Sequence, residues 1–403
     1  MSFGVLALIV AAGLAGPLLS IGRQAYVPVI VGELLAGVVI GRTGGAWLDP
    51  TEPTTAFLAD IGFAMLMFAA GMHVPIRTPG IRTGLRRGAV AAVAVGLLAV
   101  PGGMAIAAAV GGGDAAVYAL LLASGSAAIL LPAAQEAGLT ADTRALTVMS
   151  QVALADVAAI IALPIVMEPG HAGKAALGGL LVAASGVAVF AAARRVHDSD
   201  LVHRFRRASK HREWALDLRL ALLLLFVLAW VAQRAGTSIL VAGFTVGLLV
   251  AAIGGPKRLS KQVIGIAAGF FVPLFFVVLG ARLDLRALIE RPSYFALAAL
   301  LVGLNVVVHV AGALVTRQPL PAALAATAQL GVPAGVVAIG LASGVVTPGQ
   351  GGAIILAALA SIAICSVGVA LMARDARPGE TPQPQGSAVV PRGLPGVDAG
   401  LLE

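Results

Sequence analysis

The sequence predicts an all-α polytopic membrane protein with about thirteen transmembrane helices. Of its 403 residues, 59% are hydrophobic and only 11% are charged, whereas ordinary soluble domains carry about 25% charged residues. The mean hydropathy is +0.98, and apolar stretches recur along most of the chain. A helix needs about 20 mostly apolar residues to cross a bilayer. This composition argues against a soluble enzyme, a nucleic-acid-binding protein and a disordered chain.

Turn residues and charges divide the chain into thirteen apolar segments. In chain order, the expected transmembrane helices are residues 3–22, 24–41, 55–73, 87–110, 114–135, 144–167, 174–193, 215–233, 236–254, 262–280, 292–316, 320–344 and 350–373. No basic residue precedes the first segment, so we interpret it as a membrane helix rather than a cleaved signal. Residues 1–373 are thus a transmembrane domain, and the Pro- and Gly-rich tail 374–403 is expected to be disordered.

The distribution of lysine and arginine predicts the orientation of the chain. Of 27 basic residues, 21 follow odd-numbered helices or lie in the tail, and 6 follow even-numbered helices. Positive charge collects on the cytoplasmic side, so we expect the N-terminus outside and the C-terminus in the cytoplasm. The net charge of +8 then reflects orientation and not a nucleic-acid partner. The basic segment 194–212 is interpreted as a topology determinant on anionic lipid, with a regulatory or lipid-binding role as the alternative.

Two pairs of similar segments predict an internal repeat. Gly37 and Gly247 occupy matching positions 210 residues apart, and Gly71 and Gly280 lie 209 residues apart. This offset spans seven helices, so the second unit would enter the membrane from the opposite side. Such inverted repeats are typical of secondary transporters. The repeats would be residues 3–167 and 215–373, with residues 174–193 as a connecting helix.

Asp156 is the main candidate for a functional side chain. It lies midway along the sixth segment and is the only acidic residue near the centre of a long apolar span. Ionisable groups inside a membrane are functional candidates by default, and a carboxyl group can bind a proton in one state and a cation in another. The alternative is a structural aspartate bonded to neighbouring helices. Gln151 is a candidate lining residue, and Cys365 falls opposite Asp156 in the second repeat.

Helix-breaking residues interrupt the fifth and twelfth segments. Paired interruptions in matching segments point to a transporter's binding site, because unwound backbone offers carbonyl oxygens. The alternative is two kinked helices without unwinding. The predicted helix-break residues are Pro132, Gly331 and Pro333, and the candidate polar lining residues are Ser124, Ser126, Thr327 and Gln329. For each lining residue, the alternative is a hydrogen bond to its own helix backbone.

Five other polar residues lie in or beside the predicted helices. Glu33 is roughly mid-span and must be paired or protonated. His73 and Arg282 end matching helices of the two repeats, where they would tune gating or simply reach the interface. Asn305 and His309 lie four residues apart on one helix face, an arrangement that favours a satisfied packing contact.

Several of these segments together resemble one family. They are the second segment from Pro28 to Gly41, the third from Asp60 to Gly71, the fifth from Ser126 to Pro132 followed by residues 135–139, and the runs Leu240–Leu248 and Phe271–Asp284. The chain resembles the monovalent cation–proton antiporters, in the branch shared by sodium/proton exchangers and potassium-efflux proteins. The resemblance implies thirteen helices, crossed broken helices, a dimerisation domain and elevator-type alternating access, with Asp156 as the ion-binding residue.

The chain departs from the family pattern at several positions. Ala155 stands where the family often has Asp, Asn or Gln, and Ala127 stands where it usually has Thr. His73 replaces a frequent Glu, and Val332 follows Gly331 where potassium-efflux relatives often have Glu. These differences leave the identity of the cation open.

The expected function is exchange of Na+ or K+ for H+ by a homodimer in the plasma membrane. A single mid-membrane carboxylate favours electroneutral, one-for-one exchange. No catalytic or cofactor-binding constellation is apparent, so neither an enzyme nor a cofactor is expected. Two rivals remain: a sodium-coupled symporter of an organic anion, and a non-transporting sensor or partner-binding module.

Overall fold

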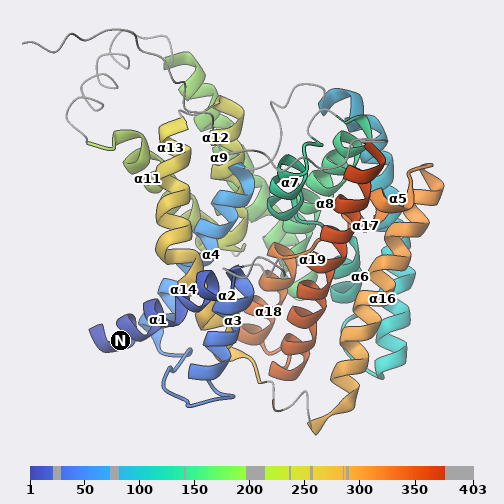
Figure 1. Cartoon of the computed structure of the whole chain (residues 1–403). Coiled ribbons are helices and arrows are strands. Elements are labelled where there is room, and N and C mark those ends of the chain that lie inside the picture. The colour runs from blue at the N-terminus through green and yellow to red at the C-terminus, as the bar shows by residue number, and fades with distance from the viewer. Residues whose placement is uncertain are drawn as a thin grey trace, which may run out of the picture.

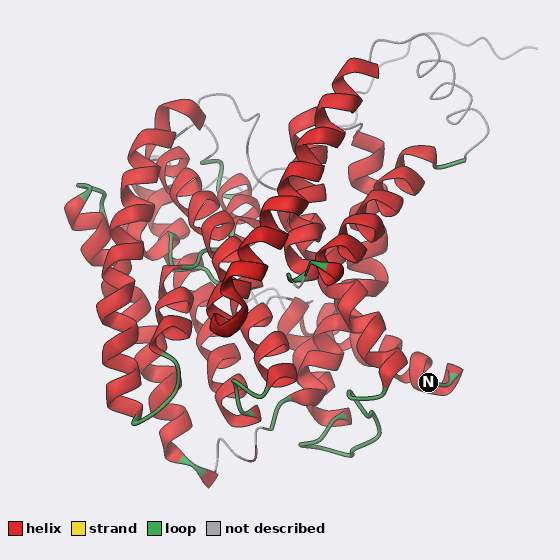
Figure 2. Cartoon of the chain, turned by 180° about the vertical axis from the view of Figure 1, so that it is seen from behind, coloured by secondary structure: helices red, strands yellow, loops and turns green. Residues whose placement is uncertain are grey.

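The described part of the chain is helical throughout. A computed structural model describes residues 1–20, 29–72, 81–139, 142–196, 214–235, 237–254, 257–284, 286 and 290–376, and these contain helices and connections but no strand (Figure 2). Within them, nine helices are long and apolar enough to cross a membrane, and four shorter apolar helices lie between these. Each falls in one of the thirteen expected segments, which confirms the predicted fold class.

The helices form two groups, which lie on the left and the right of Figure 1. The first, here the panel group, comprises α1 (Phe3–Gly13), α2 (Ala15–Ser20), α3 (Val29–Ile40), α4 (Pro53–Met72), α11 (Leu216–Arg234), α12 (Ile239–Ile253), α13 (Lys257–Ile266), the π-helix η2 (Ala267–Phe271) and α14 (Val272–Arg282). The second, here the core group, comprises α5 (Ile81–Val110), α6 (Ala115–Ala123), α7 (Ala127–Glu136), α8 (Thr143–Met167), α16 (Pro292–Val315), α17 (Leu320–Ala325), α18 (Gly331–Ser343) and α19 (Pro348–Ala376). The short helix η1 (Pro169–His171) and the connecting helix α9 (Ala172–Val196) join them.

Aspartate caps start two helices of the core group. The side chain of Asp114 accepts a hydrogen bond from Ala116 N–H at 2.8 Å, at the start of α6. The side chain of Asp142 accepts from Arg144 N–H at 2.7 Å and Ala145 N–H at 2.9 Å, at the start of α8. These caps satisfy backbone donors that lack a partner within the helix.

Glycine contacts hold the panel helices together. A methyl group on Gly37 of α3 would collide with the carbonyl oxygen of Val277 in α14, and one on Gly280 would collide with the carbonyl oxygen of Leu34. A methyl group on Gly71 of α4 or on Gly247 of α12 would likewise meet the backbone of the other helix. The four glycines of the proposed repeat therefore form two tight helix contacts, α3 with α14 and α4 with α12.

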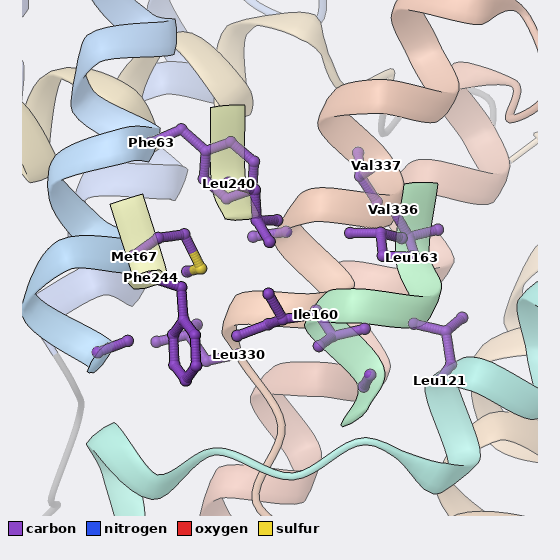
Figure 3. Close-up of a cluster of buried hydrophobic side chains, with 14 of the residues drawn as sticks. Phe63, Met67, Leu121, Ile160, Leu163, Leu240, Phe244, Leu330, Val336 and Val337 are labelled. Atoms are coloured by element: carbon purple, nitrogen blue, oxygen red, sulfur yellow. The ribbon is translucent and has the colours of Figure 1, made fainter. Parts of the chain in front are cut away.

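Large apolar side chains fill the seam between the two groups. Figure 3 shows Phe63 and Met67 of α4 and Leu240 of α12 beside Ile160 and Leu163 of α8. All five are buried. A Cβ atom on Gly335 of α18 would lie 3.1 Å from Phe63 and 2.8 Å from Leu163, so α18 also closes on this seam. The groups thus meet through side chains without polar links among these residues.

The tenth span, expected over 262–280, is a helix with a π-helical turn inside it. It consists of α13, η2 and α14. Pro273 has no N–H to offer the carbonyl of Gly269, which lies inside η2, so the regular hydrogen-bond ladder cannot pass this point. The last helix, α19, continues through Ala376, and the rest of the predicted tail lies outside the described residues.

Candidate functional site at the two helix breaks

The fifth span unwinds beside α8. Helix α6 ends at Ala123 and α7 begins at Ala127, with Ser124 and Ser126 in extended conformations. A Cβ atom on Gly125 would lie 3.0 Å from a side-chain carbon of Val152. The unwound backbone therefore rests against α8 one turn before Asp156, on the same helix face.

The side chain of Asp156, in α8, lies against the N-terminus of α7. The Ala127 N–H donates a hydrogen bond to Asp156 Oδ2 at 3.3 Å. Ala127 is the first residue of α7, and its N–H has no partner within that helix. The side chain of Ser126, at the N-cap position, makes no capping hydrogen bond. The carboxyl group of Asp156, which is only 3% exposed, therefore takes the place of a cap, where the helix dipole favours negative charge.

The first break also offers oxygen atoms near Asp156. The hydroxyl of Ser124 donates to the Leu121 carbonyl at 2.8 Å, which confirms the alternative of bonding within its own helix. No hydrogen bond between described residues ends on the carbonyl oxygens of Ser124 or Gly125. These carbonyls and the buried Ser126 hydroxyl are the oxygen ligands that the break can supply to a hard cation.

The twelfth span unwinds between α17 and α18, and buried amides occupy this second break. Gln329 Nε2 donates to the Leu121 carbonyl at 2.6 Å and to Asn305 Oδ1 at 3.1 Å. Asn305 Nδ2 donates to the Thr327 carbonyl at 3.0 Å. Thr327 follows the end of α17, and its hydroxyl donates back to the Leu324 carbonyl of that helix at 2.7 Å and to the Ser361 carbonyl of α19 at 3.4 Å. Because Leu121 lies in the last turn of α6, the hydrogen bond from Gln329 links the two breaks directly.

Helix α19 adds two side chains to the second break. Ser361 Oγ accepts a hydrogen bond from Gln329 N–H at 3.1 Å, and Cys365 Sγ donates to the Ala325 carbonyl at 3.1 Å. His309 Nδ1 lies 2.9 Å from the Asn305 carbonyl oxygen one turn away, which agrees with the expected packing contact. Asn305 and Ser361 were not predicted as site residues. Their polarity inside apolar spans was the signal that could have identified them.

The prolines do not lie at the breaks. Pro132 lies inside α7, six residues after the unwound backbone ends at Ser126. Pro333 lies in the first turn of α18, where a missing N–H costs no helix hydrogen bond. Only Gly331 directly adjoins a break, as the first residue of α18. The interruptions expected in these two spans exist, but residues 124–126 and 326–330 carry them.

Comparison with known proteins decides the family. A family model described as "Sodium/hydrogen exchanger, transmembrane" matches residues 5–374. The chain belongs to the sodium/hydrogen exchanger family. Among its relatives is "Probable Na(+)/H(+) antiporter 3" of Methanocaldococcus jannaschii, 25% identical over 73% of this chain and 76% of the relative. "Na(+)/H(+)-K(+) antiporter GerN" of Bacillus cereus is 25% identical over 67% and 69%. The "Glutathione-regulated potassium-efflux system protein KefC" of an Enterobacter species is 29% identical over 69% of this chain but 44% of the relative.

Gln151 contacts a different part of the core group. Its Oε1 accepts a hydrogen bond from Gln318 Nε2 at 3.2 Å, in the connection before α17. A methyl group on Gly88 would lie 2.8 Å from the Gln151 backbone nitrogen, so α5 covers this part of α8. The structure therefore places Gln151 in a contact between α8 and the α16–α17 connection.

Two of the three secondary polar candidates, Glu33 and Arg282, lie in the panel group. Glu33 is 3% exposed, and its Oε2 has no hydrogen-bond partner. Arg282 Nη2 donates to the Pro50 carbonyl at 3.3 Å. Arg282 lines a cavity of about 580 Å³ together with Asp60 and Glu168, and Asp156 is not among the residues lining it. His73 lies outside the described residues.

Proposed function

We propose that this exchanger moves a monovalent cation, Na+ or K+, in one direction and H+ in the other, with both competing for Asp156. The observation that carries the proposal is the Ala127 N–H donating to a buried carboxyl group at a helix break. A carboxylate is favoured at this helix N-terminus, while its burial keeps it from remaining charged without a partner. Either a proton or a cation meets this requirement.

Cation coordination at Asp156 uses oxygen atoms of the first break. Alkali cations are hard ions that take carboxylate, carbonyl, hydroxyl and water oxygens. We assign the Asp156 carboxylate, the Ser124 and Gly125 carbonyls and the Ser126 hydroxyl to this shell, completed by water. Among the described residues, no group of three or more His, Cys, Asp or Glu side chains could hold a metal ion.

Exchange through Asp156 would be electroneutral. The second break presents neutral amides, a hydroxyl and a thiol to its surroundings. One carboxylate then carries either one proton or one monovalent cation in each crossing. An imposed membrane potential should leave the exchange rate unchanged.

Alternating access would follow from movement of the core group against the panel group. The apolar seam between them supports sliding, since few polar contacts would have to break (Figure 3). The repeat pairs α3 with α12 and α4 with α14. A two-fold axis relating these pairs would turn the α3–α14 glycine contact into the α4–α12 contact, and the presence of both contacts supports inverted repeats.

We also propose a homodimer in the plasma membrane, with the N-terminus outside and the C-terminus in the cytoplasm. The distribution of basic residues supports this orientation.

The relatives named above favour exchange over the two rivals. Their names describe antiporters and a potassium-efflux protein, and not a symporter of organic anions or a sensor. None of the three names describes an enzyme.

The direct test is the Asp156→Asn variant in proteoliposomes with an internal pH dye. Asparagine keeps the size of the side chain and an oxygen that accepts from Ala127 N–H, but it carries no negative charge and releases no proton. We expect Na+-, K+- and Li+-dependent pH changes to fall to the level of empty liposomes, with normal expression and thermal unfolding. Asp156→Glu should retain partial exchange, and Ser361→Ala serves as a variant of the other break. Normal exchange by Asp156→Asn would overturn the proposal.

A further inference from the structure

An elongated apolar groove lies between α8, α9 and α12, on the side of α8 facing the connecting helix. Its volume is about 560 Å³, and none of the residues lining it is charged. The wall from α9 is made of Ala176, Gly179, Ala183 and Gly186, with the larger Leu180 and Val187 at its edge. The small side chains of this face leave the space unfilled, since a methyl group on Gly179 would meet no atom within 4 Å.

The groove opens on a surface that the bilayer covers. Three residues at its edge are largely exposed: Ile161 at 53%, Leu180 at 67% and Val187 at 67%. All three lie within helices long and apolar enough to cross a membrane. Because the solvent along such helices is lipid, the molecules that reach this groove are hydrocarbon chains.

The length of the groove matches one leaflet of the bilayer. From Ala176 to Val187 the helix rises by about 16 Å, at about 1.5 Å per residue. Half of a hydrocarbon core of about 30 Å is about 15 Å. The groove narrows where a methyl group on Gly186 would lie 2.6 Å from Thr245 Cγ2. A single extended acyl chain fits this shape, whereas a compact ligand would leave it partly empty.

One end of the groove carries an unsatisfied polar group. Thr237, just before α12, is 8% exposed, and its hydroxyl has no hydrogen-bond partner. Thr237 and Pro164 line both the groove and the cavity that contains Asp60 and Arg282, so this end borders polar surroundings. A buried hydroxyl left unpaired is costly, and an ester carbonyl arriving with the chain would accept its hydrogen bond.

We propose that this groove binds one acyl chain of a membrane phospholipid, in the leaflet on the Thr237 side, with an ester oxygen at the Thr237 hydroxyl. The chain would contact Val157, the neighbour of Asp156 in α8, and Val241 of α12 in the panel group. A bound lipid would therefore touch both groups of helices. Binding is independent of the proposed exchange and is measurable without it.

Adjacent alanines on α9 provide a matched pair of variants. Ala183 and Ala184 are both exposed, but only Ala183 lines the groove. Native mass spectrometry of the protein, purified in detergent with added phosphatidylethanolamine and phosphatidylglycerol, should detect one retained phospholipid per chain. Ala183→Phe should lower retention at least fivefold, and Ala184→Phe should not change it. Thr237→Val should lower it about fivefold, the equivalent of one hydrogen bond of about 1 kcal/mol.

A second measurement uses the unmodified protein, so it does not depend on how Ala183→Phe folds. A phosphatidylcholine with a photoactivatable acyl chain, reconstituted in nanodiscs, should label residues 157–165, 176–187 and 241–252 more strongly than the exposed Leu97 and Met104 of α5. Uniform labelling of all exposed faces would overturn the proposal. So would equal retention by the two alanine variants, or retention of free fatty acid or detergent only.

Discussion

The two helix breaks differ in the backbone ends that they present to neighbouring side chains. At the first break, an N–H of α7 points at a carboxylate, Ala127 to Asp156. At the second break, a carbonyl of α17 accepts from a thiol, Ala325 from Cys365. An ionised carboxylate is a hydrogen-bond acceptor only. It can therefore pair with the N–H at the first break but not with the carbonyl oxygen at the second, so the first break is the one that suits an ion-binding aspartate. Similar chain interruptions thus produce one break that suits the proposed cation site and one that suits a structural junction.

The two breaks also differ in how many of their polar side chains have hydrogen-bond partners. Around the second break, Gln329, Asn305 and Ser361 bond one another or the local backbone. Around the first, the Ser126 side chain makes no capping bond. A fully satisfied polar network holds its geometry, whereas unsatisfied oxygens are free to bind a cation. We expect substitutions at the second break to change stability and those at the first to change transport.

The largest effect on stability should come from Cys365→Asp, which places a carboxylate at the second break. The new carboxylate would face the Ala325 carbonyl, so acceptor meets acceptor in a buried site. We expect a loss of about 3–5 kcal/mol in the free energy of unfolding, as for an unpaired buried charge, measured by thermal and denaturant unfolding in detergent. Cys365→Ser keeps a donor and should stay within about 1 kcal/mol of the parent. A stable Cys365→Asp protein that exchanges a second ion per cycle would erase the distinction between the breaks.

The next effect should come from Gln329→Leu. It removes the donor that serves both the Leu121 carbonyl and Asn305 Oδ1, and leaving buried acceptors unpaired costs about 1–3 kcal/mol. Because Gln329 and Asn305 share a bond, the double variant Gln329→Leu, Asn305→Leu should cost less than the sum of the single variants. Additive losses in unfolding experiments would show that the amides do not act as one network.

The sequence predicted the existence of both breaks more readily than their positions. Composition and length identified the spans, because about 20 apolar residues admit few other structures. The breaks were assigned to Pro132, Gly331 and Pro333. Gly331 directly adjoins the second break, but both prolines lie inside helices, because a proline in a helix can be accommodated by its surroundings. Unwinding instead follows tertiary contacts, such as Gly125 against Val152. Such contacts join residues far apart in the chain, and no local pattern encodes them.

Individual site residues show the same limit. Asp156 was identifiable from its isolation in an apolar span, and the structure places it against Ala127. Gln151 was assigned to the same site because it lies nearby in sequence, but it bonds to Gln318. Which side of a buried helix faces which neighbour depends on packing. The sequence pattern carries little information on it when all sides are apolar.

Matched glycine variants extend the comparison of the two repeats to the panel group. Gly37→Ala and Gly247→Ala would each press a methyl group on the backbone of a facing helix, at Val277 and Phe68 respectively. Overpacking of this kind costs about 1–3 kcal/mol, and matching repeat positions should give similar losses in unfolding experiments. Gly96→Ala, where no atom lies within 4 Å, should be neutral or stabilising by up to about 1 kcal/mol. A large difference between Gly37→Ala and Gly247→Ala would argue against equivalent positions.

The smallest losses of stability should come from two serine variants, one at each break. Comparing their unfolding free energies with their KM values distinguishes a structural break from a cation-binding one. Ser361→Ala removes the oxygen that accepts from Gln329 N–H, so we expect a loss of about 1 kcal/mol in unfolding free energy with the KM for the cation unchanged. Ser126→Ala removes no capping bond, so stability should stay within about 0.5 kcal/mol. If the Ser126 hydroxyl is a cation ligand, the KM should rise about fivefold, the equivalent of about 1 kcal/mol, while kcat changes less. The reverse pattern, with the KM altered only by Ser361→Ala, would place the cation at the second break. The amides there bond to Leu121, Asn305 and Thr327 and not to Asp156, so this result would contradict the proposed site.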